Sequence, residues 1–191
     1  MNRQRLGAGA LVLAVLALGR VVTDRLPDPI DVLTATVERP ATLREPLSLH
    51  SMDVTITELT GAKSMVNLGT YETTPGVWLV FTAQITPRDK DLVAPYAAIR
   101  AADGMTWAAV GRSQVYCDSA IPGLPTQCIG RIEVPPDRLA GASLLMSANR
   151  NNQSYEDMAV LPLRVTENEL QTWLARTDDR ALALTPEGLE P

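Results

Sequence analysis

Alternation of apolar and polar residues with a period of two recurs along the chain and predicts β-strands. The clearest case is the segment 77–86, bounded by Pro75-Gly76 and Pro87. One face of this predicted strand carries Val77, Leu79, Phe81, Ala83 and Ile85, and the other carries Trp78, Val80, Thr82, Gln84 and Thr86. Because proline and glycine interrupt regular structure, both ends of the strand are defined.

Further short strands follow the same pattern, and turn residues separate them. They are expected at 52–57, 64–68, 96–100, 106–110, 127–134, 142–148 and 158–165. Gly61-Ala62 marks a turn, Asp103-Gly104 indicates a type I′ hairpin, and 149–153 forms a polar turn. Because Pro162 has no N–H to donate in a sheet, the last strand is expected at a sheet edge or with a bulge.

Seven or eight such strands without helices between them predict an all-β fold, an antiparallel β-sandwich of the immunoglobulin-like kind over residues 47–165. After this domain the pattern changes to helical spacing. Thr166 and Glu169 form a capping box, and Leu170, Trp173 and Leu174 make an apolar stripe. Residues 166–191 are therefore expected to form a short C-terminal helix of about ten residues and a loosely ordered tail, with local packing of 181–184 as the alternative for that stretch.

The N-terminal segment 1–22 is the most apolar part of the chain. Residues 6–19 form a run of 14 residues without a charge, and Arg3 and Arg5 precede it. The positive-inside rule then places the N-terminus inside and the rest of the chain outside the cytoplasm.

Two fates of this segment are compatible with its length. A run of 14 residues suits the h-region of a signal peptide cleaved after Gly19. Alternatively, Arg20 extends outward and lengthens the apolar span to Val22, which makes residues 1–22 an uncleaved transmembrane signal-anchor. We expect the anchor, followed by a proline-rich tether over 23–46 with a possible edge strand within 30–37.

Net charge excludes one class of partner. The chain carries 17 basic and 22 acidic residues, a formal net charge of −5. Residues 1–22 contribute +3, so the exported part carries −8. Nucleic-acid binders present basic patches, so no nucleic-acid partner is expected.

Few residues offer catalytic or metal-binding chemistry. His50 is the only histidine, and His50 together with Met52 supplies too few ligands for a copper site. Lys63-Ser64 would point to opposite faces of a strand, and no phosphate loop or nucleophile elbow occurs. We therefore expect no enzyme activity, no cofactor and no metal site.

Cys117 and Cys128 lie eleven positions apart around Pro122, Gly123 and Pro125. In an oxidising compartment this spacing favours a structural disulfide over a redox-active pair, which usually has Cys-x-x-Cys spacing. The three tryptophans, Trp78, Trp107 and Trp173, are candidate partner-binding residues, with burial in the sandwich as the alternative.

Several short stretches together resemble a known group of proteins. They are 74–81, 96–100, Asp103-Gly104, and Pro135-Pro136 followed by 139–142. Over about residues 50–165 the chain is similar to exported immunoglobulin-like domains of uncharacterised function, found behind a signal or membrane anchor in actinobacteria. Fifteen arginines against two lysines fit such a source. The resemblance implies a β-sandwich at the cell envelope with a binding or assembly role, and it supplies no catalytic residues.

The expected function is that of a non-catalytic accessory subunit of a cell-envelope membrane complex for transport or polymer export. It would be held in the plasma membrane by one helix, with the C-terminal domain outside the cytoplasm and an integral membrane protein as its partner. The alternative is a secreted ligand- or glycan-binding module released by signal-peptide cleavage.

Overall fold

The computed structural model describes residues 20, 35–67, 70–149, 156–177, 182–185 and 188–190. Residues Thr36–Pro191 form one compact unit and Met1–Ala35 form another, and the fold below is that of the first. The expected membrane helix over 1–22 lies outside the described residues, apart from Arg20. In the ranges given above, no helix is long and apolar enough to cross a membrane.

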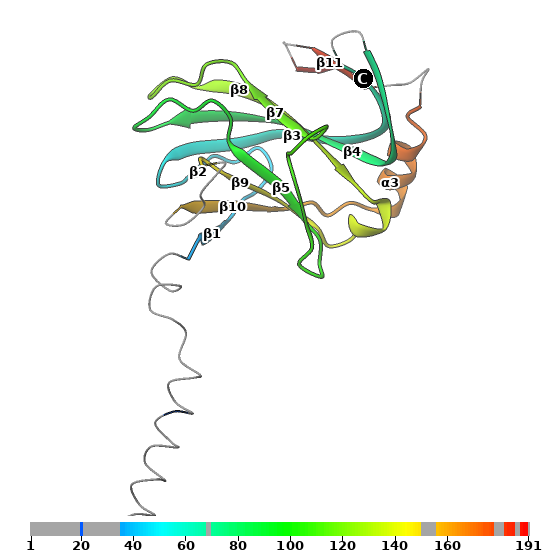
Figure 1. Ribbon diagram of the computed structural model, residues 1–191, viewed down its shortest axis with the longest axis horizontal. Coiled ribbons are helices and arrows are strands. Elements are labelled where there is room, and N and C mark those ends of the chain that lie inside the picture. Colours follow the sequence, from blue (N-terminus) through cyan, green and yellow to red (C-terminus); the bar gives the residue numbers. More distant parts are fainter. Residues whose placement is uncertain are drawn as a thin grey trace, which may run out of the picture. The chain divides into compact units, whose positions relative to one another are not determined.

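Two β-sheets make up the domain (Figure 1). The first sheet has the order β1 (Val37–Pro40), β10 (Asp157–Pro162), β9 (Ser143–Ser147), β5 (Tyr96–Arg100) and β6 (Thr106–Ala108). The second has the order β12 (Gly188–Glu190), β11 (Leu182–Thr185), β3 (Met52–Asn67), β4 (Thr70–Pro87), β8 (Thr126–Val134) and β7 (Gln114–Cys117), and β2 (Leu47–Ser48) also pairs with β3. The prediction of an all-β sandwich is confirmed, and most strand pairs are antiparallel as expected. The pairs β1–β10 and β11–β3 are parallel.

The core lies between the inner faces of the two sheets. On β4 the face that carries Val77, Leu79, Phe81, Ala83 and Ile85 is fully buried in it. Phe81 faces Gly130 of β8 in the register, and a Cβ at Gly130 would lie 2.0 Å from the phenyl ring. Glycine at this position therefore leaves the space that the chain's only phenylalanine fills.

The turn expected at Gly61-Ala62 is wrong, because β3 runs through both residues without reversing. The segments expected as two strands at 52–57 and 64–68 are one strand, with shifts of register after Ile56 and after Ala62. Glycine is needed at position 61 because the Trp173 ring lies against the backbone there, 2.5 Å from where a Cβ would stand. A close approach, not a turn, explains this glycine.

The connection between β5 and β6 also differs from expectation. Gly104 has φ 88°, whereas Asp103 is not among the residues with positive φ. The Gly104 N–H donates to the Ala101 carbonyl, and the Ala101 N–H donates to the Met105 carbonyl. A type I′ turn would need two positive φ angles, so this is a hairpin with a glycine bulge.

Sheet pairing extends beyond the segment 47–165. β1 lies within the range expected to be a tether, and β11 and β12 lie within the range expected to be a loosely ordered tail. Pro162 pairs with Ser143 of β9, while pairing with β1 ends at Val160. The proline thus lies where β10 has no hydrogen-bonded neighbour on its other side. The expected polar turn at 149–153 lies outside the described residues except for Asn149.

The 3₁₀ helix η1 (Pro136–Arg138) follows β8, and α3 (Glu167–Leu174) follows β10. The predicted capping box is confirmed, with Thr166 as the N-cap and Glu169 as its partner. Trp173 is the buried residue of α3 and joins the core between the sheets. The helix has eight residues and ends two residues before the expected end near Arg176.

Candidate functional site

The predicted disulfide is confirmed and joins two neighbouring strands of the second sheet. Cys117 of β7 and Cys128 of β8 face each other in the register, with their Cα atoms 4.3 Å apart. Cys128 is buried in the core, and Cys117 packs against it. The bridge therefore fixes the edge strand β7 to the body of the sheet.

The three tryptophans lie in different surroundings. Trp78 and Trp173 are buried, with 0% and 7% of their surface exposed, so neither presents an open ring to a partner. Trp107 is half-buried and packs against the edge of the core. Partner binding by Trp107 stays a prediction, whereas Trp78 and Trp173 lie where the burial alternative places them.

His50 and Met52 do not come together as a metal site. Met52 is buried in the core and His50 is exposed. In the part of the chain that the structure describes, no group of three or more His, Cys, Asp or Glu side chains is arranged to hold a metal ion.

A groove opens at the end of the sandwich where β3 begins and β4 ends. Its volume is about 1110 Å³, and we call it the main groove. It is lined by His50, Ser51, Pro87, Asp89, Lys90, Asp91, Leu92, Val93, Ala94, Pro95, Tyr96, Ala97, Ala108, Ala109, Val110, Val115, Ala148, Asn149 and Glu156. This volume lies slightly above the range of about 300–1,000 Å³ that is common for ligand pockets.

Backbone hydrogen bonds hold the loop 88–95, which forms one wall of the main groove. The Leu92 N–H donates to the Ala120 carbonyl at 2.8 Å, and the Arg88 N–H donates to the Ser51 carbonyl at 3.0 Å. The Arg88 side chain also forms an ion pair with Asp53 at 2.7 Å. The hydrogen bond from Ser48, followed by that from Arg88, holds the pKa of Asp53 below its usual value. The loop is thus held at its first residue, Arg88, and again at Leu92.

Exposed aliphatic side chains border the main groove. Val93 is 89% exposed and Val110 is 68% exposed, although both are large apolar residues. Val115 of β7 also lines the groove, two residues from the disulfide. An apolar surface around a hollow is typical of an interaction site.

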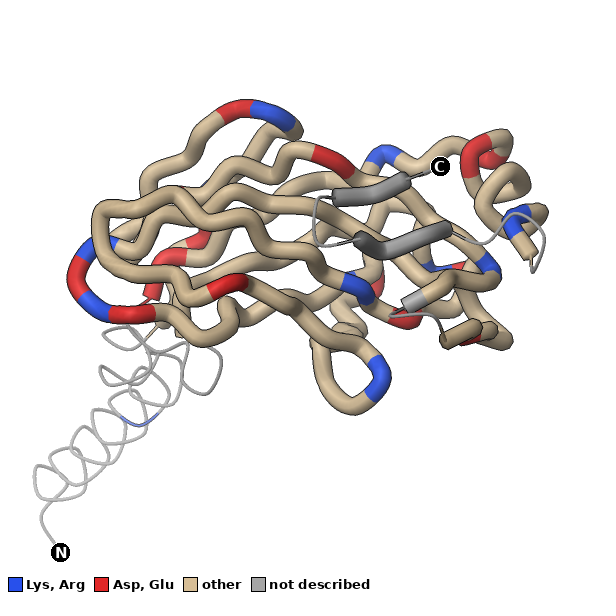
Figure 2. The backbone as a smooth tube through the Cα atoms, turned by 90° about the horizontal axis from the view of Figure 1, so that it is seen from above, with Lys and Arg blue, Asp and Glu red and all other residues tan. Residues whose placement is uncertain are grey.

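Carboxylates outnumber ammonium groups in the same groove. Asp89, Asp91 and Glu156 line it together with Lys90. Residues 88–91 are four consecutive charged residues of one loop, and Figure 2 shows how charged positions are distributed along the backbone. The Ser51 hydroxyl donates to Glu156 at 2.8 Å and orients this carboxylate. The groove therefore combines an apolar surface with a negative charge.

A second hollow lies on the other side of β6, and we call it the Trp107 hollow. Its volume is about 640 Å³. It is lined by Pro75, Gly76, Thr106, Trp107, Ala108, Val110, Ser113, Glu133, Val134, Pro135 and Pro136. Ala108 and Val110 line both hollows, so the two hollows adjoin at these residues.

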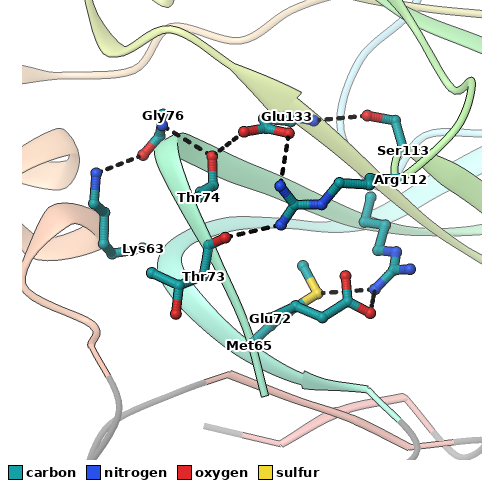
Figure 3. Close-up of polar contacts among 10 residues, drawn as sticks. Lys63, Met65, Glu72, Thr73, Thr74, Gly76, Arg112, Ser113 and Glu133 are labelled. Carbon is teal, nitrogen blue, oxygen red and sulfur yellow. Dashed lines mark hydrogen bonds and ion pairs between the residues drawn. The ribbon is translucent and has the colours of Figure 1, made fainter. Parts of the chain in front are cut away.

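The loop between β6 and β7 carries Val110, and Arg112 ties this loop to the second sheet (Figure 3). The Arg112 guanidinium donates to the Thr73 carbonyl at 2.8 Å and lies 3.8 Å from Glu133. It also lies 5.1 Å from the centre of the Trp78 ring, a cation–π distance. Next to it, the Ser113 hydroxyl accepts the N–H of Glu133 at 3.0 Å. These contacts hold the loop where the two hollows adjoin.

A second arginine covers Trp78 on the outer face of the sheet. Arg131 is 4% exposed and lies 5.6 Å from the Trp78 ring centre. It donates to Glu72 at 2.8 Å and to Gln114 at 3.4 Å. Its charge is thus paired, as a buried charge has to be. Trp78 thus lies beneath two guanidinium groups and does not itself form a binding surface.

Sequence reasoning missed most residues of this site. Neither the charged loop 88–91 nor the pairing of Arg112 with Glu133 has a motif that would reveal it. The short apolar stretch Leu92-Val93 directly after four charged residues is the one local signal of the loop.

Comparisons with known proteins give the context of the fold. No protein-family model matches the chain, and no curated protein matches it. Among solved structures, an uncharacterised β-sandwich protein from Clostridium difficile 630 is similar with a TM-score of 0.47 and 14% identity, covering 68% of this chain and 97% of that one. The YjhA protein from Bacillus subtilis is similar with a TM-score of 0.45 and 9% identity, covering 63% of this chain and 99% of that one.

Proposed function

We propose that the domain is a non-catalytic binding module at the cell envelope, in which the main groove docks a partner protein. The observation that carries this proposal is the exposure of Val93 and Val110, 89% and 68%, on either side of a hollow of about 1110 Å³. Large aliphatic side chains in such a position lose contact with water when a partner covers them. The Trp107 hollow extends the same surface across Val110.

An integral membrane protein is the proposed partner, because the domain would be held close to the bilayer. If residues 1–22 span the plasma membrane, only the 14 residues 23–36 separate them from β1. A chain of this length reaches at most about 50 Å. The Val37 N–H donates to the carbonyl of Glu156, a residue that lines the main groove. The groove therefore lies where the chain enters the domain.

Export through an N-terminal anchor and an extracytoplasmic location belong to the same proposal. The disulfide supports them, because such bridges persist in oxidising compartments. A relation to actinobacterial immunoglobulin-like domains, and a role in transport or envelope-polymer export, are proposed from the sequence resemblance.

Photo-crosslinking in native membranes tests the proposed docking surface. A photoreactive residue at Val93 is expected to give a discrete adduct with a membrane protein, and Val110→Asp is expected to abolish it. Tyr71 offers a matched control, because it is 62% exposed and does not line either hollow. A crosslinker at Tyr71 should give no such adduct, and Tyr71→Asp should leave the Val93 adduct unchanged. Equal adducts from both positions would contradict the proposal.

The alternative is a secreted module that binds a small ligand or a glycan, for which the main groove offers enough room. Intact-mass measurement of the protein from its native host separates the two functions. Loss of residues 1–19 would indicate signal-peptide cleavage and secretion. Retention of these residues in the membrane fraction would indicate the anchored form.

A further inference from the structure

We infer that the main groove recognises a peptide segment in which aliphatic side chains are flanked by lysine or arginine. The inference rests on the proposed docking function and names the chemistry of the segment that docks. The occupant is a loop or terminus of the partner that lies outside the cytoplasm.

The apolar half of this recognition comes from three valines. Val93 and Val110 border the groove and Val115 lines it, so an inserted aliphatic side chain would contact β-branched residues from separate parts of the chain. Pro95 and Ala94 continue the same surface along the loop. Such a site gains affinity by removing apolar area from water and sets little requirement on which aliphatic residue enters.

The charged half comes from the loop 88–91 and from Glu156. The lining contains three carboxylates, of Asp89, Asp91 and Glu156, and one ammonium group, of Lys90. It therefore carries a net negative charge. Arg88 does not add to the lining charge, because its guanidinium pairs with Asp53. A cationic side chain next to the inserted aliphatic residue therefore gains from electrostatic complementarity.

Other ligand classes fit this lining less well. Phosphate-bearing lipids and nucleic acids would meet the same carboxylates and be repelled. Stacking on a sugar or a base needs open aromatic faces, and of the two aromatic side chains that line the main groove Tyr96 is half-buried, which leaves only the imidazole of His50 exposed. A basic, aliphatic peptide matches both properties of the groove.

A phage-displayed library of random twelve-residue peptides, selected on the full-length protein in detergent, tests this inference. Peptides that carry lysine or arginine beside valine, leucine or isoleucine should be enriched. The Val93→Asp/Val110→Asp protein should not retain them. A representative peptide is then synthesised, and its affinity is measured by fluorescence anisotropy.

The double variant Asp89→Asn/Asp91→Asn should weaken binding of that peptide about five- to tenfold, because two exposed ion pairs are lost. The matched variant Glu58→Gln/Asp137→Asn removes the same charge at two exposed positions outside the groove and should leave the affinity unchanged. Raising the salt concentration should weaken the peptide's binding to the unaltered protein and have less effect on its binding to the Asn variant.

Two results would overturn the inference: enrichment of acidic or purely apolar peptides, or equal affinity of the Asn variant for the basic peptide. If either is found while the Val93 crosslink still depends on Val110, docking at the groove stands and only its charge recognition is wrong. If the Val93 crosslink is absent, the proposed function itself fails.

Discussion

The two ends of the sandwich differ in how the edge of the core is covered. Two packed sheets leave the edge of their shared core open at each end, and something has to cover it. At one end α3 does so (Figure 1), and Trp173 of this helix fills the space above Gly61. At the other end the loop 88–95 borders the main groove, which stays open, and Val93 and Val110 are exposed there.

The contrast separates stability from binding. The α3 end has a capping box, a buried indole and backbone contacts such as the bond from the Lys63 N–H to the Arg176 carbonyl at 3.1 Å. The groove end has backbone hydrogen bonds and a disulfide, but its apolar side chains Val93 and Val110 face solvent. Substitutions at the α3 end should lower the free energy of unfolding, and substitutions at the groove end should weaken the binding of the partner.

The largest effect is expected at Trp173. Replacement by alanine removes a side chain that is 7% exposed and leaves a cavity over Gly61. The free energy of unfolding should fall by about 3 kcal/mol or more, measured by urea denaturation. Val93→Ser at the groove end should change it by less than about 0.5 kcal/mol. Similar losses from both variants would remove the contrast between the ends.

Loss of the disulfide should have the next largest effect. The variant Cys117→Ala/Cys128→Ala opens a loop with a sequence separation of 11 residues, and the chain-entropy estimate for such a loop is about 3 kcal/mol. Because β7 carries Val115 into the main groove, the Val93 crosslink should also weaken. A stable variant with an unchanged crosslink would show that β7 does not depend on the bridge.

Local sequence patterns were enough to predict the sandwich but not all of its strands. The alternation at 77–86, the capping box at Thr166 and the disulfide all depend on residues near one another in sequence, and each is present as predicted. Gly61 was misread as a turn because its neighbour Trp173 lies more than a hundred positions away. β1 pairs with β10, which is similarly remote, so no local pattern could distinguish it from a tether.

The site was harder to predict than the fold. The main groove is assembled mainly from the loop 88–95, the residues after β6 and Glu156 just before β10, and each part is unremarkable alone. Exposure of Val93 depends on the path of the loop, which Arg88 and Leu92 fix through contacts with Ser51, Asp53 and Ala120. Such contacts follow from tertiary structure and leave no motif.

A smaller effect is expected at Arg112, which joins the groove end to the second sheet. Arg112→Gln removes the cation over Trp78 and the pairing with Glu133, for an expected loss of about 1 kcal/mol. Acrylamide should then quench tryptophan fluorescence more strongly, because Trp78 loses part of its cover. Arg138→Gln is the control, since Arg138 pairs with Asp103 on the surface, and it should not alter quenching. Unchanged quenching in Arg112→Gln would show that Arg131 alone protects the ring.

The smallest effect concerns acid, and it compares one carboxylate from each end. The Thr166 side chain, followed by the Thr166 backbone, lowers the pKa of Glu169, while Ser48 followed by Arg88 lowers that of Asp53. A lowered pKa means that the folded state holds the proton less tightly than the unfolded chain does. The stabilisation is therefore present above the unfolded pKa, near 4.5 for Glu169 and 3.8 for Asp53, and it disappears as the pH falls through the lower folded values. Glu169→Gln and Asp53→Asn should each make the free energy of unfolding less dependent on pH below about 4.5, in urea titrations at successive pH values.

Only Asp53→Asn should also weaken the Val93 crosslink at neutral pH, because Asp53 holds the loop 88–91 through Arg88 and Glu169 holds only the start of α3. If Glu169→Gln weakened that crosslink equally, the two ends would be coupled, and closure by α3 would be part of binding.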